Sequence, residues 1–336
     1  MLNRKLPYVI AEVGSNHLGI KKLAEQSIVL AKKAGADCVK FQLFDENNLV
    51  NKKLKVYKHV SDKSLKYQHE RFKKVKLTID YLKILSKRAK KNKIDFCVTP
   101  FDHSYVKKIK NYVTFFKVAS GDINNYSLLK EISKTRKKVV ISTGMSNLNE
   151  IKKALSFFPK NKVTLLHCIS SYPTLKKDAN LINISYLKNK FKVSTGYSDH
   201  VPGIETAAKS IFFGAQIIEK HFMPKKTKLA GDYKLSIDFI DLKRLINLIK
   251  ENFEIIGSNR KKYFNCEKYG IKTLRRSIYF FKNLNKGDKI KKNDIILLRP
   301  FNKTGIKIKD LNKILGTSIK KKVKKNQLLT YKVLRS

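Results

Sequence analysis

The chain alternates short apolar runs that end at polar residues with longer stretches whose apolar residues recur at the helical period. The apolar runs read as strands at 8–14, 37–42, 95–100, 115–121, 139–144, 164–168, 193–200 and 216–221. Amphipathic helices are predicted between them, among others at 21–35, 78–92, 104–112, 149–158, 203–214 and 240–253. Apolar strands separated by helices are typical of a parallel α/β sheet. Eight of them within about 255 residues predict a (β/α)8 TIM barrel.

A doubly wound sheet is the competing fold for this pattern. It normally carries a glycine-rich G-x-G-x-x-G loop after its first strand, where a dinucleotide phosphate binds. That motif is absent from the sequence. The barrel is therefore the favoured prediction.

The pattern changes after Ile256, and this divides the chain. Residues 257–274 are polar and lack periodicity, so they read as a linker. Beyond them, the runs RRSIYFF, ILLRP and LLTYKVL are strand-like and are separated by turn residues. We therefore expect a catalytic barrel at 1–256 and a small β-rich domain at 275–336.

The charge is extreme, with 74 Lys+Arg against 26 Asp+Glu and a formal net charge of +48. A basic surface is the usual footprint of a nucleic-acid-binding protein. Here the lysines are spread singly and in pairs over every predicted helix, and no known nucleic-acid-binding motif accompanies them. We therefore expect neither a nucleic-acid partner nor a function for most of this charge.

Nothing in the sequence predicts a membrane segment or an oxidised protein. No apolar run approaches the roughly 18–20 residues that span a bilayer, and the first residues lack a signal-type cleavage site. The four cysteines, Cys38, Cys97, Cys168 and Cys266, are scattered without a metal-binding spacing. Three of them lie in or beside apolar strands, where a reduced thiol is a small apolar filler. We expect a cytoplasmic protein.

Polar side chains end all eight predicted strands, and in a barrel these ends meet at one mouth, where active sites lie. They are Glu12, Lys40, Gln42, Thr99, Lys117, Ser120, Ser142, Thr143, His167, Ser198, Asp199, His200, Glu219 and His221. His200 and His221 end neighbouring strands and could share a divalent metal. The lysines and hydroxyls suit a phosphate or carboxylate ligand.

Eight motifs along the barrel resemble those of the N-acetylneuraminate (sialic acid) synthase family, which includes legionaminic and pseudaminic acid synthases. They are IAEVGSNHLG (10–19), KFQLF (40–44), TPFD (99–102), FKVASGDI (116–123), ISTGM (141–145), LLHCISSYP (165–173), GYSDH (196–200) and IEKHF (218–222). The C-terminal segment resembles the antifreeze-protein-like (SAF, β-clip) domain of the same family. The resemblance covers nearly the whole chain.

The resemblance implies a condensation of phosphoenolpyruvate with an N-acetylated amino sugar of the N-acetylmannosamine type. The products are phosphate and a nine-carbon 2-keto sugar acid. A diacetamido-hexose acceptor, as in pseudaminic or legionaminic acid synthesis, is the alternative. The resemblance also implies a divalent ion, Mn2+ before Mg2+ or Co2+, and a domain-swapped homodimer.

The same resemblance assigns residues to roles. Phosphoenolpyruvate would be bound by Thr99, Lys117, Ser120, Ser142 and Ser198. The catalytic groups would be Glu12, Lys40, Gln42, Glu219 and Asp232, with His200 and His221 as the metal ligands. Sugar contacts would come from Tyr172, Glu219 and Asp232, and from Arg299 acting from the partner subunit.

One segment departs from the family pattern. Sialic-type members usually read G-P-D-H-K-A-S after the last strand, whereas this chain reads AGDYKLS at 230–236. Asp232, Lys234 and Ser236 match, but the Pro-Asp-His core is lost, and SIDF at 236–239 is closer to the pseudaminic type. The sequence therefore predicts the chemistry and leaves the acceptor sugar open.

Two other functions compete with this interpretation. A barrel aldolase would use a Schiff-base lysine, with Lys40, Lys117 or Lys220 as the nucleophile. A non-enzymatic binder of phosphate or nucleic acid would use the +48 charge itself. Borohydride trapping and the salt dependence of DNA affinity distinguish these from a metal-dependent synthase.

Overall fold

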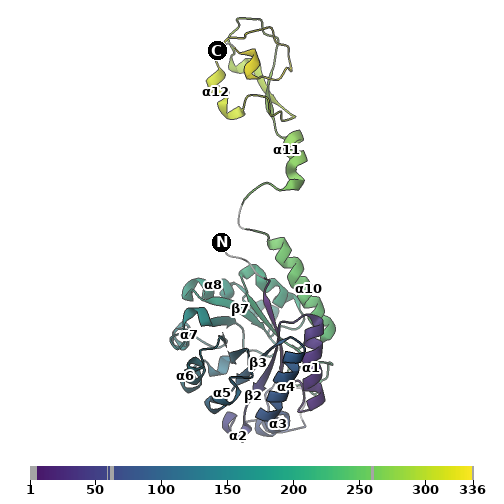
Figure 1. The fold of residues 1–336 in the computed structure, drawn as a ribbon, viewed down its shortest axis with the longest axis vertical. Coiled ribbons are helices and arrows are strands. Elements are labelled where there is room, and N and C mark those ends of the chain that lie inside the picture. The colour runs from purple at the N-terminus through teal and green to yellow at the C-terminus, as the bar shows by residue number, and fades with distance from the viewer. Residues whose placement is uncertain (1–5, 59, 61–63, 259–260, 335–336) are drawn as a thin grey trace. The chain divides into compact units, whose positions relative to one another are not determined.

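The computed structural model describes residues 6–58, 60, 64–258 and 261–334. The chain divides into two compact units, Met1–Gly257 and Ser258–Ser336 (Figure 1). Each unit has its own cluster of buried apolar side chains. They are described separately below.

The first unit is a closed barrel of eight parallel strands, in which each strand pairs with the next and β8 pairs with β1 (Figure 1). The strands are β1 Tyr8–Gly14, β2 Cys38–Leu43, β3 Asp95–Pro100, β4 Phe115–Val118, β5 Val139–Ser142, β6 Val163–His167, β7 Ser194–Asp199 and β8 Ile217–His221. The predicted TIM barrel is confirmed. Each observed strand lies within its predicted range or extends one residue beyond it.

Helices surround the barrel (Figure 1). They are α1 Lys21–Ala34, α2 Glu46–Leu49, α3 Gln68–Val75, α4 Ile79–Lys91, α5 His103–Ile109, α6 Tyr126–Lys134, α7 Leu148–Leu155, α8 Ile182–Phe191, α9 Glu205–Lys209 and α10 Phe239–Ile256. The predicted helix at 203–214 is α9 followed by a 3-10 turn, Ser210–Phe213. None of the helices in the described part of the chain is long and apolar enough to cross a bilayer.

Side-chain caps start several of the helices that follow the strands. The Asp102 carboxylate accepts a hydrogen bond from the Ser104 N–H at 2.7 Å, which starts α5 only two residues after β3 ends. The Asp238 side chain does the same for α10 by accepting from the Asp241 N–H. Such caps satisfy backbone donors that have no partner within the helix. The Asp102 cap keeps the loop between β3 and α5 short.

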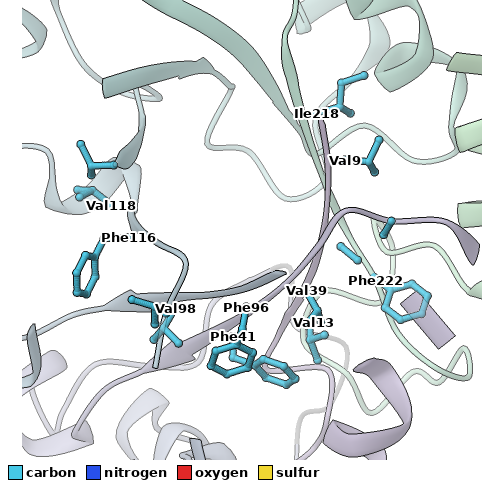
Figure 2. Close-up of a cluster of buried hydrophobic side chains, with 14 of the residues drawn as sticks. Val9, Val13, Val39, Phe41, Phe96, Val98, Phe116, Val118, Ile218 and Phe222 are labelled. Atoms are coloured by element: carbon cyan, nitrogen blue, oxygen red, sulfur yellow. The ribbon is translucent and has the colours of Figure 1, made fainter. Parts of the chain in front are cut away.

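The two faces of the barrel wall carry different residues, because successive side chains of a strand point to opposite sides. The outward side chains are almost all apolar and pack under the helices, as Figure 2 shows for Phe41, Phe96 and Phe116. The inward side chains form a smaller apolar layer of Ile10, Cys38, Cys97, Phe115, Val140 and Leu166. Beyond that layer, towards the carboxyl ends of the strands, the inward side chains become polar.

The second unit is small and has little regular structure. Its elements are α11 Lys268–Leu274, β9 Ser277–Phe280, β10 Ile295–Leu298 and α12 Leu311–Ile314, with β9 and β10 paired antiparallel. Ile278, Phe280, Ile319 and Leu329 are among the side chains of its core. Of the three runs predicted as strands, RRSIYFF and ILLRP contain β9 and most of β10.

Two details of the C-terminal prediction are wrong. The run LLTYKVL (328–334) forms isolated bridges and a 3-10 turn, Tyr331–Val333, in place of a strand. The segment 257–274, expected to lack regular structure, contains a 3-10 turn at Asn265–Glu267 and α11. The helix was missed because none of its residues is buried, so it has no apolar face for a pattern to reveal.

Candidate active site

The carboxyl ends of the strands bring together most of the predicted barrel residues. Those that project into the mouth from the strands themselves are Glu12, Lys40, Gln42, Thr99, Lys117, Ser142, Ser198, Glu219 and His221. All of these are buried except Gln42, which is half-buried. Ser120, Tyr172, His200 and Asp232 lie on the loops that follow the strands.

Glu12 and Lys40 form an ion pair on neighbouring strands. Lys40 Nζ lies 2.7 Å from Glu12 Oε2, and Glu12 and Lys40 face each other in the register of β1 and β2. Gln42 Nε2 donates to Glu12 Oε1 at 3.1 Å, and Lys40 Nζ donates to Thr99 Oγ1 at 3.3 Å. The head groups of all four residues are thereby held in one orientation.

Glu219 lies between two lysines across the barrel. Lys117 Nζ is 3.6 Å from its Oε1 and Lys40 Nζ is 3.6 Å from its Oε2. Ser198 Oγ donates to Glu219 Oε1 at 2.9 Å, and Lys117 Nζ donates to Ser142 Oγ at 2.6 Å. These contacts place two ammonium groups and two hydroxyls around one small volume, which is the arrangement that a phosphate or carboxylate ligand requires.

The surroundings push the pKa values of the two glutamates in opposite directions. Burial raises the pKa of Glu12, and its neighbour Lys40 only partly offsets this. Burial acts on Glu219 too, but Lys117, Lys40 and the Ser198 hydroxyl outweigh it and lower its pKa to about 2. Two carboxyls with separated pKa values can take different parts in one reaction. Glu219 is the permanent anion of the pair.

The two lysines also differ. Burial would lower the pKa of Lys40, but Glu12 and Glu219 outweigh burial, so its pKa is raised. For Lys117, burial and the nearby Lys40 charge lower the pKa despite Glu219. An incoming anion next to Lys117 would compensate for that lost solvation.

Ser120, in the loop after β4, belongs to a second set of hydrogen-bonding groups. Its Oγ accepts from the Gly144 N–H at 3.1 Å and lies 3.1 Å from the Cys168 sulfur. A Cβ at Gly144 would lie 2.3 Å from Ser170 Oγ and 3.0 Å from Ser120 Oγ. Glycine at this position therefore lets the Gly144 N–H approach Ser120. Cys168 is buried as predicted, but it contacts a site residue as well as filling space. Cys38 and Cys97 are apolar fillers, and Cys266 is exposed.

Three aromatic rings meet on the opposite side of the mouth. The ring centroids of His200 and His221 are 5.4 Å apart, and the Tyr172 ring lies 4.3 Å from that of His200. Nδ1 of His200 lies 2.7 Å from the carbonyl oxygen of Ile169, so it must carry the proton because a carbonyl only accepts. Burial and the nearby His221 lower the pKa of His200 to about 3.

The histidine pair fits the divalent metal that the sequence predicts. His200 is neutral, and its hydrogen bond from Nδ1 to the Ile169 carbonyl leaves the lone pair of Nε2 free to bind a metal. His221 Nδ1 is buried and has no hydrogen-bond partner in the described part of the chain. A metal–nitrogen bond is about 2 Å long, so rings 5.4 Å apart can reach one ion. No group of three or more His, Cys, Asp or Glu among the described residues could hold a metal, so water or substrate would complete the shell.

Asp232 is held over the mouth by a network that the sequence did not reveal. Its Oδ2 lies 3.4 Å from His221 Nδ1. Asn16, in the loop after β1, donates to both the Phe222 carbonyl and the Ser236 hydroxyl at 3.0 Å. Ser236 Oγ in turn donates to the Asp232 carbonyl at 2.7 Å. Asn16 therefore joins the loops after β1 and β8, and only its place in the SNH run hinted at a role.

The position of Arg71 explains why glycine stands at position 231 in the AGDYKLS segment. It lies on α3, far from this segment in the sequence, and donates to Ser15 Oγ at 3.1 Å. A Cβ at Gly231 would lie 1.8 Å from Arg71 Nη2. Glycine at this position, where relatives of the sialic type carry proline, makes room for the guanidinium. No pattern in the sequence pointed to Arg71.

Three predicted residues of the barrel, His167, Asp199 and Lys220, lie on the outer face of the wall, and Arg299 belongs to the second unit. His167 Nε2 lies 2.8 Å from the Ala179 carbonyl oxygen, and its ring stacks on that of Tyr197. Arg299 is exposed and follows β10 in the second unit, so the barrel is described without it. Lys220 was a candidate Schiff-base nucleophile, but it points to the outer face of the wall and is fully buried against Asp199. Lys220 cannot meet a substrate at the mouth, which removes it from the list of nucleophiles.

Comparison with known proteins decides the family. Residues 27–261 match the NeuB family, and residues 275–335 match the SAF domain. The chain belongs to the NeuB family. The family resemblance and the C-terminal SAF domain seen in the sequence are confirmed.

NeuB-type relatives match this chain over nearly its full length. The N,N'-diacetyllegionaminic acid synthase of Campylobacter jejuni is 35% identical and aligns with 97% of this chain and 99% of its own. The pseudaminic acid synthase of the same species is 29% identical over 95% of this chain and 94% of its own. The crystal structure of the N-acetylneuraminic acid (sialic acid) synthetase from Leptospira borgpetersenii has a TM-score of 0.72 and 31% identity. It covers 81% of this chain and 94% of that one.

The loop after β1 of this NeuB protein makes stability depend on pH. His17 is buried, its Nδ1 accepts from the Gly19 N–H at 3.1 Å, and burial lowers its pKa to about 4. In the unfolded chain its pKa is about 6.5, so unfolding takes up a proton below that pH. The free energy of unfolding should fall by about 3 kcal/mol from this group as pH drops from 6.5 to 4.

Urea unfolding of the full chain at pH 7, 5.5 and 4.5 measures this effect against a His17→Asn variant. Asparagine keeps an acceptor for Gly19 but does not titrate. The variant should lose less stability than the wild type over this range. Equal losses in both proteins would contradict the assignment.

Proposed function

We propose that this NeuB protein condenses phosphoenolpyruvate with an N-acetylated amino sugar to give a nine-carbon 2-keto sugar acid and phosphate. The observation that carries the proposal is the pair of buried lysines, Lys40 and Lys117, flanking Glu219 beside the His200–His221 pair. Each half of this site suits one reactant. The lysine side suits a small anion, and the histidine side suits a carbonyl oxygen held by a metal.

Phosphoenolpyruvate fits the lysine side because it carries a phosphate and a carboxylate on one carbon. Lys117 with Ser142 would hold one anionic group, and Ser120 with the Gly144 N–H would extend the donor set. Lys40 with Thr99 would hold the other, next to Ser198. Fixed donors of this kind also stabilise the negative charge that grows on phosphate as it leaves.

The carbon–carbon bond forms when carbon 3 of phosphoenolpyruvate attacks the aldehyde carbon of the open-chain sugar. Carbon 2 then becomes positively charged, water adds to it, and the tetrahedral intermediate expels phosphate. We assign Glu12, oriented by Gln42, to stabilise that positive charge. Holding the two reactants in line supplies a large share of the acceleration, up to roughly 7–11 kcal/mol in favourable cases.

We assign His200 and His221 to a divalent ion, with Mn2+ as the first candidate. When bound, such an ion acts as a Lewis acid on the sugar aldehyde. The protein's own contribution is to keep the His200 imidazole neutral and to fix it through Ile169. Tyr172, Asp232 and Glu219 border this side of the mouth and are assigned to the sugar.

For the acceptor sugar, N-acetylmannosamine and a diacetamido hexose are both compatible with the site. The second is favoured by two observations. The legionaminic acid synthase of Campylobacter jejuni matches this chain end to end at 35% identity. The loop that carries Asp232 also has Gly231 and Tyr233 in place of the Pro and His of sialic-type members, and Gly231 accommodates Arg71.

Mass spectrometry of the reaction product tests the proposed function. The purified chain is incubated with phosphoenolpyruvate, Mn2+ and either N-acetylmannosamine or a diacetamido hexose. A new acid with the carbon atoms of both substrates is expected from at least one acceptor. Its absence with every acceptor, while phosphoenolpyruvate stays intact, would contradict the proposal.

Replacing Lys117 should affect phosphoenolpyruvate far more than the sugar. A charge-assisted hydrogen bond contributes about 1.5–3 kcal/mol, so Lys117→Ala should raise KM for phosphoenolpyruvate by roughly 10- to 100-fold. KM for the sugar should change little. Initial rates at varied concentrations of each substrate measure both constants, with Lys107→Ala on the exposed face of α5 as the control. A raised KM for the sugar alone would place Lys117 in the wrong half of the site.

The proposal also covers the oligomeric state and the cellular location of the enzyme. We propose a homodimer in which the SAF domain of one subunit delivers Arg299 to the barrel of the other. The exposure of Arg299 and the separate core of the second unit support this. A reducing, cytoplasmic location is supported by the three buried free thiols Cys38, Cys97 and Cys168.

A further inference from the structure

A charged pair lies on the outer face of the barrel wall, which is otherwise mostly apolar. Asp199 and Lys220 face each other in the register of β7 and β8, and neither side chain has any exposed surface. Their neighbours Ser198 and Glu219 are hydrogen-bonded to each other inside the barrel, so Asp199 and Lys220 point outward. Figure 2 shows that outward positions such as Val9, Val39 and Ile218 are apolar instead.

The pair ties the end of β8 to the turn after β7. Lys220 Nζ donates to Asp199 Oδ2 at 2.9 Å and also to the Val201 carbonyl. Asp199 Oδ1 accepts from the Val201 N–H at 2.9 Å. The side chain of Tyr197, also on the outer face of β7, hydrogen-bonds to Asp199 as well. The bonds to both backbone groups of Val201 therefore fix the chain directly after residue 200.

Stability alone does not account for such a pair. Removing two charges from water costs several kcal/mol per ion, and well-packed apolar residues in their place are often as stable or more so. What the pair adds is a directional link, which apolar side chains cannot supply. That link joins the residue immediately before each histidine: Asp199 precedes His200, and Lys220 precedes His221.

We propose that Asp199 and Lys220 are positioning residues that set the distance and orientation of His200 relative to His221 for a divalent metal. This inference rests on the metal assignment made above. The pair acts through the backbone, because both side chains point away from the imidazoles. Other loops already hold the two histidine backbones, through Thr174 N–H to the His200 carbonyl and Ile237 N–H to the His221 carbonyl, each at 2.9 Å. Two side-chain links join the two strand ends directly, Ser198–Glu219 inside the barrel and Asp199–Lys220 on its outer face, and the second is the one adjacent to both histidines.

Mn2+ titration of the full chain, followed by electron paramagnetic resonance of the free ion, tests this without using activity. The variant is Asp199→Leu with Lys220→Met, which replaces both charged groups by apolar side chains and removes the link. Residues that orient metal ligands typically change affinity by about 10- to 100-fold, so the Kd for Mn2+ should rise at least about 10-fold. Thr195→Val is the matched control, because Thr195 is a buried polar residue on the same face of β7 whose Oγ1 has no hydrogen-bond partner among the residues that the structure describes.

Thermal unfolding of each variant separates positioning from support of the fold. A folded double variant with the Kd of the wild type would overturn the positioning role and leave the metal assignment intact. If that double variant does not fold, Asp199→Asn with Lys220→Met decides, since asparagine keeps the size of Asp199, can still accept from the Val201 N–H and leaves no unpaired charge; an unchanged Kd would overturn the role. If wild type and His200→Ala bind Mn2+ equally, the metal assignment itself fails, and this inference fails with it.

Discussion

His200→Ala and His221→Ala should each abolish turnover while the barrel stays folded. Each substitution removes one of two imidazoles whose ring centroids are 5.4 Å apart, and no third protein ligand is available among the described residues to replace it. Losing a residue that only orients a ligand costs about 10- to 100-fold, so losing a ligand should reduce kcat by more than about 100-fold. The cost to the fold is small, because His200 loses one hydrogen bond to Ile169, worth about 1 kcal/mol.

Rates of phosphate release with Mn2+, together with Mn2+ affinity, measure this prediction. His103→Ala is the matched control, because His103 is an exposed histidine at the start of α5. The control should keep wild-type turnover and affinity. If either mouth variant kept wild-type turnover in metal-stripped buffer, the histidine pair would not be a metal site.

Arg299→Ala should remove most activity, and the missing arginine should be restorable from a second subunit. A guanidinium can bind the N-acetyl oxygen of the sugar and help to close the mouth against water. The arginine belongs to a separate unit with its own core. For the same reason, truncation after Gly257 should leave a folded barrel with little activity.

Mixing two inactive variants tests the origin of Arg299. In a mixed dimer of His221→Ala and Arg299→Ala chains, one of the two sites would contain both an intact barrel and an intact arginine. Random exchange should then restore up to about a quarter of wild-type activity, because half of the dimers are mixed. No recovery, with exchange confirmed by mass spectrometry of tagged subunits, would contradict a shared site.

Much of this architecture could be predicted because the barrel has two simple rules. Strands buried on both sides are apolar throughout, and their carboxyl ends converge, so Glu12, Lys117 and His221 could be grouped before any coordinates were known. The same strand-end rule placed Lys220 among candidate nucleophiles. Side-chain alternation then separates it from Glu219, which precedes it in β8 and points inward.

What escaped prediction depends on contacts between distant segments. Arg71 meets Gly231 across 160 positions of the chain, and neither residue type signals the other. Asn16 joins two loops through the Phe222 carbonyl, a backbone group that no sequence pattern marks. The helix α11 was missed because none of its residues is buried.

The most direct test of the account is the rate of phosphate release from phosphoenolpyruvate across a panel of N-acetylated hexosamines, with Mn2+ and with a chelator. Phosphate should be released only when an N-acetylated amino sugar is present. The chelator should abolish this release, and added Mn2+ should restore it. A parallel sample with pyruvate and borohydride should give no covalent adduct. Undiminished turnover in chelator, or an adduct on Lys40 or Lys117, would contradict the account and identify a Schiff-base aldolase instead.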